Sequence, residues 1–315
     1  MRHATLRQMQ VFDTVARHLS FSRAAEELHL SQPAVSLQVR QLETLAGLAL
    51  FEQIGRQIHL TAAGETLLGH ARAVLAAMAD AEEAAAALRG RRAGGLRIAV
   101  ISTAKYFAPS LLSAFLAGYP GVELTLSIAN REQVLALLKA NQVDLAIMGR
   151  PPHDFPVAAL PFARHPMVMI APPDHPLARR RLTLAELSGQ TFLVREQGSG
   201  TRTLMEGLLA EHNVTAGRSF EMASNETIKQ AVMAGMGISL LSRHTIGLEV
   251  SVGRIAILEV EGLPVLRDWY VVYREGKQLL PVAGAFVEFL RQEGAARVEE
   301  ATRAQPPRRH RTRIK

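Results

Sequence analysis

Apolar and polar positions near the N-terminus repeat at helical spacing and predict two short helices joined by a tight turn. Residues 22–28 form the first predicted helix and residues 29–30 the turn. A second helix starts after Ser31, a residue type that caps helices. It has Pro33 in its first turn, where a missing N–H group costs nothing.

The second predicted helix has one apolar face and one polar face. The apolar side chains recur at i, i+4 and i+7 and the polar ones at i, i+4 and i+8: Val35, Val39 and Leu42, and Gln32, Ser36 and Arg40. A short helix that presents amide, hydroxyl and guanidinium groups outward fits the DNA major groove. An ordinary corner between two helices has the same pattern, so this helix alone leaves both interpretations open.

The flanking segments predict a small domain that leads into a long helix. Apolar residues within 6–16 predict a preceding helix, and two apolar runs around Gly55 predict a hairpin with Arg56 near its tip. Residues 61–89 lack proline and carry a stripe of small and apolar side chains that one isolated helix cannot bury. The stripe predicts a partner, either a second copy of the chain, which we favour, or the chain's own downstream domain.

A glycine-rich hinge linker is predicted at 90–95, and the pattern changes after it to alternating strands and helices. The first set has strands at 96–101, 122–128 and 143–148, with helices at 109–118 and 132–140. A second set has strands at 192–194, 220–222 and 238–241, with helices after Gly200 and Ser224; strand 269–273 and helix 281–292 come last. This order predicts two α/β lobes with parallel strands, between which the chain crosses twice.

Composition predicts a cytoplasmic protein of two or three domains. The chain has 315 residues, of which 48% are hydrophobic, and no cysteine, which excludes a disulfide scaffold and suits a reducing cytosol. The N-terminal residues lack the apolar core of a signal peptide, and no apolar run approaches the length of a membrane span.

The net charge of +7 is concentrated at the C-terminus. Residues 1–60 carry +1, residues 61–300 carry zero and residues 301–315 carry +6. We expect a basic, disordered tail at 294–315. The tail either adds sequence-independent attraction to DNA or is a solvated extension without a role, which we favour. DNA binding is therefore inferred from the helix pattern and not from the charge.

Polar residues that follow the predicted strands form a candidate anion site. Open α/β sheets bind ligands beyond the carboxyl ends of their strands, where helix N-termini lie. The candidates are Ser102, Thr103, Lys105, Arg150, Arg195, Gly200, Thr201, Arg202, Asn225 and Glu226. Hydroxyls, backbone N–H groups and up to four cations in one cleft suit a phosphate or a carboxylate. The alternative is that each arginine is a surface charge and the glycine loop an ordinary turn.

Five sequence blocks between residues 24 and 64 resemble the winged helix-turn-helix of LysR-type transcriptional regulators. The blocks are A-A-x-x-L, S-Q-P-A-x-S, L-E, L-F and L-T-x-A-G, in the order and spacing of that family. The chain departs from the family pattern at Leu37, Ala46 and Gln53, where a polar residue, a leucine and an arginine are common. The resemblance implies DNA contacts from Ser31, Gln32, Pro33, Ser36, Leu37, Arg40, Gln53 and Arg56.

The resemblance also implies an α/β fold class with a winged-helix N-terminus, a long linker helix and a two-lobed effector domain like that of type 2 periplasmic binding proteins. The implied domains are the winged helix at 1–60, the dimerisation helix at 61–89, lobe I at 96–161 and 267–293, and lobe II at 162–266. Implied partners are double-stranded promoter DNA, a small anionic metabolite, further copies of the chain in a homodimer or homotetramer, and RNA polymerase. No cofactor, metal or membrane is implied.

Further segments resemble the LysR-type regulators of the Calvin-cycle RuBisCO operon, among them STAKYFAP, VDLAIMGRPP and SNETIKQAVMAGMGISLLS. Gln53 is then a trait of that subfamily. The resemblance implies a transcription activator that responds to phosphorylated metabolites or nucleotides, such as ribulose bisphosphate, phosphoenolpyruvate, ATP or NADPH. A regulator of another metabolic operon with a carboxylate effector remains the alternative.

Two other classes of protein were weighed. The effector lobes alone fit a solute-binding protein, but the absent signal peptide and the 89 residues before the linker argue against that class. An enzyme would need a catalytic constellation. His165 and His175 are expected in proline-rich loops, His212 on a surface helix and Asp144 at a strand end without a metal partner. We therefore expect no enzymatic activity.

Overall fold

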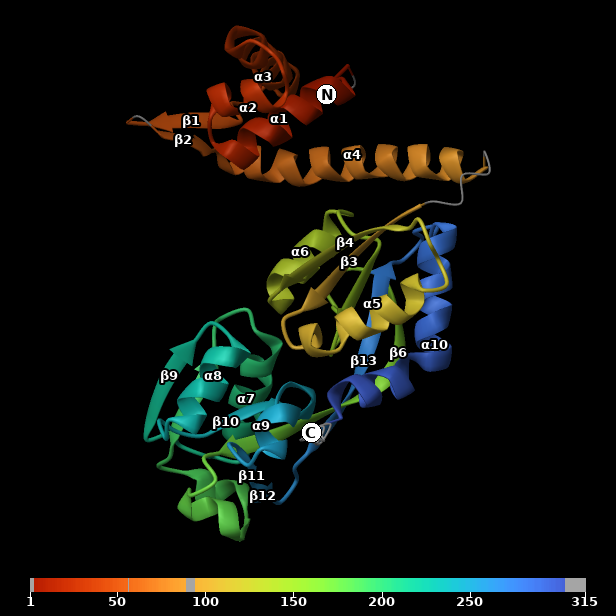
Figure 1. Ribbon diagram of the computed structural model, residues 1–315. Helices are drawn as coiled ribbons and strands as arrows, with labels where there is room; N and C mark the ends of the chain where they lie inside the picture. Colours follow the sequence, from red (N-terminus) through yellow and green to blue (C-terminus); the bar gives the residue numbers. More distant parts are fainter. Residues whose placement is uncertain (1–2, 56, 89–93, 304–315) are drawn as a thin grey trace, which may run out of the picture. The chain divides into compact units, whose positions relative to one another are not determined.

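The computed structural model describes residues 3–55, 57–88 and 94–303, which form an N-terminal and a C-terminal unit (Figure 1). The expected linker residues 90–93 lie outside this range, and Gly95 already belongs to strand β3. No helix within the described residues is long and apolar enough to cross a membrane.

The N-terminal unit is a helical domain with a two-stranded wing, as the sequence predicts. Its elements are α1 (Leu6–His18), α2 (Phe21–Glu27), α3 (Gln32–Ala46), β1 (Phe51–Ile54), β2 (Gln57–Leu60) and α4 (Ala62–Leu88). The Ser31 hydroxyl accepts a hydrogen bond from the Ala34 N–H group, and Pro33 lies in the first turn of α3. Val35, Val39 and Leu42 are buried, so the predicted apolar face of α3 is confirmed.

Two residues of the sequence blocks fix the wing against the helices. The Glu43 carboxylate at the end of α3 accepts a hydrogen bond of 2.8 Å from the Leu50 N–H group. Gly64 lies so close to the wing that a Cβ atom there would be 2.1 Å from the Leu50 carbonyl oxygen. The L-E and L-T-x-A-G blocks therefore join α3, the wing and α4 in one small core.

Helix α4 contacts α1 on one side and exposes apolar side chains on another. Leu68 and Ala71 are buried, and Arg72 forms an ion pair of 2.6 Å with Asp13. Val74 and Met78 remain 43% and 45% exposed. The apolar stripe predicted from the sequence is thus only partly buried within the N-terminal unit.

The C-terminal unit begins with the predicted parallel β-α-β-α-β set. Its elements are β3 (Gly95–Ile101), η1 (Ala104–Tyr106), α5 (Ala108–Leu116), β4 (Glu123–Ala129), α6 (Arg131–Lys139) and β5 (Leu145–Met148). β3 lies between β4 and β5 and is parallel to both. The parallel pairing of the first lobe is confirmed.

Two long antiparallel strands, β6 (Val157–Ala171) and β13 (Val265–Arg274), connect the lobes. The sequence analysis did not predict β6 because the strand contains Pro161 and Pro166, and proline cannot donate a hydrogen bond within a sheet. At both prolines β6 pairs only with β13, since β10 pairs with β6 further along, at residues 167–170. The prediction that His165 lies in a loop is therefore wrong: it lies inside β6.

The second lobe consists of short strands and helices around two apolar clusters. Its elements are η2 (Pro176–Arg179), β7 (Arg181–Leu182), η3 (Leu184–Leu187), β8 (Thr191–Arg195), α7 (Gly200–Glu211), β9 (Arg218–Met222), α8 (Asn225–Met233), β10 (Ser239–Ser242), η4 (Arg243–Thr245), α9 (Gly247–Ser251), β11 (Ala256–Ile257) and β12 (Glu259–Val260). The largest sheet has the order β10-β6-β13-β5-β3-β4, so it extends through both lobes.

The last helix, α10, runs from Pro281 to Thr302 and corrects the expected tail. Residues 294–302 are helical, whereas the sequence predicted disorder from residue 294. Val298 is buried, and Gly294 packs so closely that a Cβ atom there would be 2.7 Å from the Phe162 ring. The more basic segment 304–315 lies outside the described residues.

Candidate functional site

The first candidate site is the outer surface of α3, defined by Gln32, Ser36, Leu37 and Arg40. Gln32 and Arg40 are exposed, Ser36 is half-buried, and Leu37 is 54% exposed. The Gln32 amide donates a hydrogen bond of 3.0 Å to the Ser36 hydroxyl, which orients both side chains on one face. Ser31 and Pro33 are exposed at the start of this helix.

The wing supplies the remaining residues that the sequence assigned to DNA contact. Gln53 is exposed and its side-chain amide donates a hydrogen bond of 3.1 Å to the Gly55 carbonyl at the hairpin turn. Arg56 lies outside the described residues. The N-terminal unit thus presents a polar helix face and a short hairpin.

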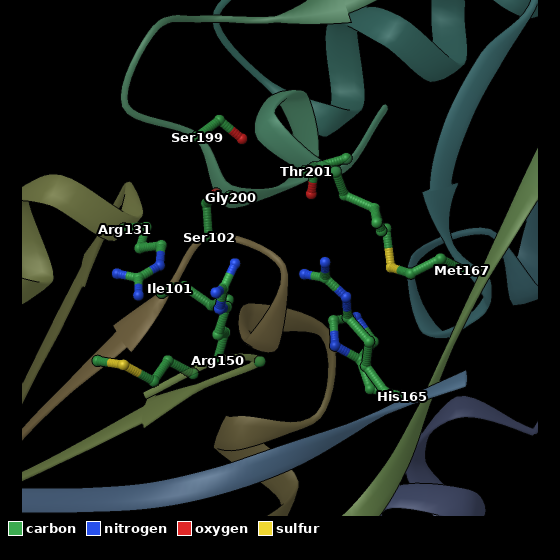
Figure 2. Close-up of a pocket in the computed structure, with 13 residues that line it drawn as sticks. Ile101, Ser102, Arg131, Arg150, His165, Met167, Ser199, Gly200 and Thr201 are labelled. Atoms are coloured by element: carbon green, nitrogen blue, oxygen red, sulfur yellow. The ribbon is translucent and has the colours of Figure 1, made fainter. Parts of the chain in front are cut away.

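The second candidate site is a pocket between the two lobes, with a cavity volume of about 30 Å³ (Figure 2). Ser102 follows β3, and Gly149 and Arg150 follow β5, at the carboxyl ends of neighbouring parallel strands. The start of α7 faces them from the second lobe, while β6 and β13 form the floor. The lining residues are Ile101, Ser102, Arg131, Met148, Gly149, Arg150, His165, Met167, Ser199, Gly200, Thr201, Leu204 and Arg267.

Three arginines, Arg131, Arg150 and Arg267, form what we call the arginine cradle of the pocket. Burial, followed by the charge of Arg150, lowers the pKa of Arg131. Burial, followed by Arg150 and Arg131, lowers the pKa of Arg267. No aspartate or glutamate is among the lining residues. These mutually repelling cations favour a bound anion.

The N-terminus of α7 adds backbone donors to the arginine cradle. Ser199 precedes this 12-residue helix and is only 5% exposed, but its hydroxyl does not cap the helix. Gly200 and Thr201 are the first helical residues and line the pocket. N–H groups in the first turn of a helix have no partner within the helix, so they can bind an anion.

His165, on β6, forms part of the pocket floor. It is 4% exposed, and its ring stacks on Trp269 with 3.8 Å between ring centroids. Neither ring nitrogen has a hydrogen-bond partner among the described residues. A buried polar group without a partner costs about 1–3 kcal/mol. A Cβ atom at Gly149 would lie 2.7 Å from Nδ1, so glycine is needed there.

The surroundings of His165 keep it neutral. Burial, followed by His244 and Arg267, lowers its pKa to about 3. The second ring, His244, accepts a hydrogen bond of 3.1 Å from the Trp269 indole N–H group, and burial lowers its pKa to about 4. His165, Trp269 and His244 therefore form an uncharged stack beside the cationic pocket.

Four of the ten residues that the sequence assigned to ligand binding line this pocket: Ser102, Arg150, Gly200 and Thr201. Thr103 is buried beside Ser102 and Asn225 is buried in α8. Lys105 forms an ion pair of 3.4 Å with Glu226, and Arg202 pairs with Glu206 at 2.7 Å.

The expectation of four cations in one cleft must therefore be corrected, since only Arg150 among them lines this pocket. Arg195 is 2% exposed and its guanidinium donates to Glu196, to Asn225 and, over 3.0 Å, to the Ser102 hydroxyl of the other lobe. It joins the two lobes. Tyr106 adds a second link by donating a hydrogen bond of 2.5 Å to Glu226.

Sequence reasoning missed Arg131, His165 and Arg267 as residues of the pocket. Arg131 starts the helix after β4, so the rule applied to the other strand ends would have found it. His165 and Arg267 lie directly opposite each other on β6 and β13. Their proximity depends on a long-range strand register that no local pattern reveals.

Asp144 and His175, which the sequence raised as catalytic candidates, have structural roles. The buried Asp144 carboxylate pairs with Arg97 at 2.7 Å and with Lys277 at 3.0 Å. His175 accepts a hydrogen bond from the Leu177 N–H group and caps a short helix. His212 is exposed at the end of α7.

The chain belongs to the LysR family of bacterial transcriptional regulators. Residues 6–65 match the family described as "Bacterial regulatory helix-turn-helix protein, lysR family" and residues 89–295 match "LysR substrate binding domain". Together these regions include both the α3 surface and the inter-lobe pocket.

Two similar proteins are regulators from bacteria. The HTH-type transcriptional regulator CbbR of Rhodospirillum rubrum is 65% identical over 293 residues, which cover 92% of this chain and 98% of the relative. The RuBisCO operon transcriptional regulator of Allochromatium vinosum is 50% identical, over 93% of this chain and 97% of the relative.

Two solved structures share the fold. The regulatory domain of Synechocystis CcmR in complex with 2-PG is 42% identical with a TM-score of 0.61, over 62% of this chain and 95% of that one. Full-length CbnR complexed with its target DNA is 25% identical with a TM-score of 0.64, over 91% of this chain and 99% of that one.

Acidification should destabilise the C-terminal unit. His165 and His244 have folded pKa values of about 3 and about 4, below the usual 6.5 of an unfolded chain. The unfolded state binds more protons in this window, so stability is complete above pH 6.5 and falls as the pH drops. Lowering the pH from 6.5 to 5.5 should cost about 1 kcal/mol per histidine.

Urea unfolding followed by the emission of Trp269, the only tryptophan of the chain, measures this effect. His165→Phe should keep the stack and remove one titrating group, so the variant should lose about 1 kcal/mol less than the wild type over the same pH step. If the wild type and the variant lost the same free energy of unfolding over this pH step, His165 would not be one of the titrating groups.

Proposed function

We propose that the chain activates transcription of Calvin-cycle RuBisCO operon genes in response to a small phosphorylated metabolite bound in the inter-lobe pocket. The observation that carries the ligand assignment is the arginine cradle facing the N-terminus of α7, in a pocket without a carboxylate. The name of the Allochromatium relative supports the target, and the CcmR complex with 2-PG supports the ligand class.

The chemistry of the pocket suits a phosphate group. Arginine forms paired hydrogen bonds with phosphate oxygens, and the α7 N–H groups add donors without further charge. A phosphate dianion neutralises more of the three positive charges than a monocarboxylate does, which favours a phosphorylated effector.

A ligand in the pocket biases the arrangement of the lobes. Arg131 and Arg150 belong to the first lobe and the α7 N-terminus to the second, so an anion that contacts both favours a closed arrangement. The Arg195–Ser102 and Tyr106–Glu226 hydrogen bonds already join the lobes at this edge. The ligand shifts the equilibrium by its difference in affinity for the two arrangements.

The N-terminal unit supplies the DNA contacts and a pairing surface. The α3 surface enters the major groove, and the wing, with Gln53 and Arg56, contacts the flanking backbone. Exposed Val74 and Met78 on α4 pair with a second copy, so that two recognition helices bind together. We propose a dimer that assembles into a tetramer, acts in the cytoplasm, contacts RNA polymerase and has no catalytic role.

Replacing Gln32 by alanine should weaken binding to promoter DNA about 5- to 150-fold, because one base contact contributes about 1–3 kcal/mol of discrimination. Fluorescence anisotropy with DNA from upstream of RuBisCO genes measures the affinity. Gln292→Ala, on the exposed side of α10, is the matched control and should bind normally. Normal affinity in the Gln32 variant, with folding and assembly intact, would overturn the assignment of α3.

Replacing Arg150 or Arg267 by glutamine should weaken effector binding about 10-fold or more, because a charge-assisted hydrogen bond contributes about 1.5–3 kcal/mol. Calorimetric titration with ribulose bisphosphate, phosphoenolpyruvate, ATP and NADPH measures this effect. Arg164→Gln is the matched control, since Arg164 is on β6 but its side chain is 78% exposed. Unchanged affinity in both pocket variants would move the ligand site elsewhere, and tighter binding of simple carboxylates would change the ligand class.

A further inference from the structure

His165 differs in kind from every other polar side chain of the inter-lobe pocket. The arginine cradle carries positive charge, whereas the His165 ring is uncharged, and Ser102, Ser199 and Thr201 are hydroxyls near the α7 side. In Figure 2, Arg131 and His165 lie on opposite sides of Arg150. The pocket therefore combines three cationic side chains with one uncharged imidazole.

Packing alone does not explain a histidine at this position. The stack on Trp269 needs an aromatic ring but no ring nitrogen, and both nitrogens are buried without a hydrogen-bond partner among the described residues. A buried polar atom without a partner is destabilising, so its presence calls for an explanation. A phenylalanine would stack equally well without that penalty.

The neighbours of His165 also fix the place of its ring. Gly149 leaves room for the ring, because any Cβ atom there would collide with Nδ1. The register of β6 with β13 sets Arg267 directly opposite His165, so one occupant can contact both side chains. Gly149, Arg267 and Trp269 together hold the ring at the edge of the ligand space.

We propose that His165 is a specificity-determining residue of the pocket, which hydrogen-bonds a second oxygen function of the effector while the arginine cradle binds its phosphate. This inference rests on the proposed function of the pocket. A neutral imidazole has one donor and one acceptor nitrogen, so it suits a hydroxyl, carbonyl or carboxylate oxygen. The preferred effector is then bifunctional: a phosphate joined to a second oxygen-bearing group.

Two kinds of ligand should then differ in their affinity for the pocket. Inorganic phosphate can occupy the arginine cradle but carries no second oxygen-bearing group for His165. Ribulose bisphosphate and phosphoenolpyruvate carry a phosphate and a further oxygen function. The wild-type protein should therefore bind at least one of these organic phosphates more tightly than inorganic phosphate, and that difference should depend on His165.

The test is calorimetric titration of the full chain and its variants with inorganic phosphate, ribulose bisphosphate and phosphoenolpyruvate. His165→Phe should weaken the preferred organic phosphate about 10-fold and change the affinity for inorganic phosphate less than about twofold, as expected for one lost hydrogen bond. His165→Asn retains an amide donor and acceptor and should recover part of the affinity. His212→Asn, on the exposed end of α7, is the matched control.

Trp269 gives a second readout, because it is the only tryptophan and contacts His165 directly. Its emission should change when an organic phosphate binds to the wild type and change less with inorganic phosphate. Unperturbed unfolding of the free His165→Phe variant confirms that its ring keeps the stack on Trp269. If His165→Phe does not fold, the selectivity of His165→Asn decides the question.

Three outcomes would overturn the inference. They are an equal loss of affinity for all three ligands in the His165 variants, no loss for any of them, and a wild type that binds neither organic phosphate more tightly than inorganic phosphate. The proposed function fails separately, when Arg150→Gln and Arg267→Gln leave all affinities unchanged. If the arginine variants lose affinity for the ligands but the His165 variants do not distinguish between them, the pocket is still the ligand site and His165 does not determine its specificity.

Discussion

The antiparallel pairing of β6 with β13 is the constraint on which the candidate ligand site depends. These strands continue one sheet through both lobes, and their register sets His165 opposite Arg267 beneath the pocket. A shift of either strand by one residue would turn its side chain to the other face of the sheet, so that His165 and Arg267 would no longer lie together. The same pairing brings Trp269 against His165, so the floor of the pocket, its third arginine and its neutral ring have a common origin.

The helices and the wing of the N-terminal unit could be predicted from the sequence, because the contacts that set their ends are local. Ser31 caps α3, Glu43 binds the start of the wing, and Gly64 allows the wing to approach α4. Each of these contacts spans fewer than about 20 residues, within the reach of motif spacing. The parallel strands of the first lobe were equally accessible, since buried strands that alternate with helices define that arrangement.

The ligand pocket was only partly predictable, because sequence position gives the end of a strand but not the partner of a side chain. Ser102 and Arg150 follow strands and line the pocket as expected, whereas Lys105 and Arg202 follow strands and pair with glutamates. The Lys105 partner, Glu226, lies on α8, and no spacing rule predicts that contact. The Arg202 partner, Glu206, lies four residues further along α7, a spacing that sequence reasoning could have used. Pro161 and Pro166 concealed β6 and with it His165, although both prolines fall where β6 has a single neighbouring strand.

The central claim is that an anion in the inter-lobe pocket changes how the N-terminal unit engages promoter DNA. DNase footprinting upstream of RuBisCO genes, with and without ribulose bisphosphate or phosphoenolpyruvate, tests it most directly when the wild type is compared with Arg267→Gln. The account predicts that at least one metabolite changes the extent or cleavage pattern of the wild-type footprint, while the variant protects the same DNA without responding. An absent wild-type footprint, or an equal response in both proteins, would contradict it.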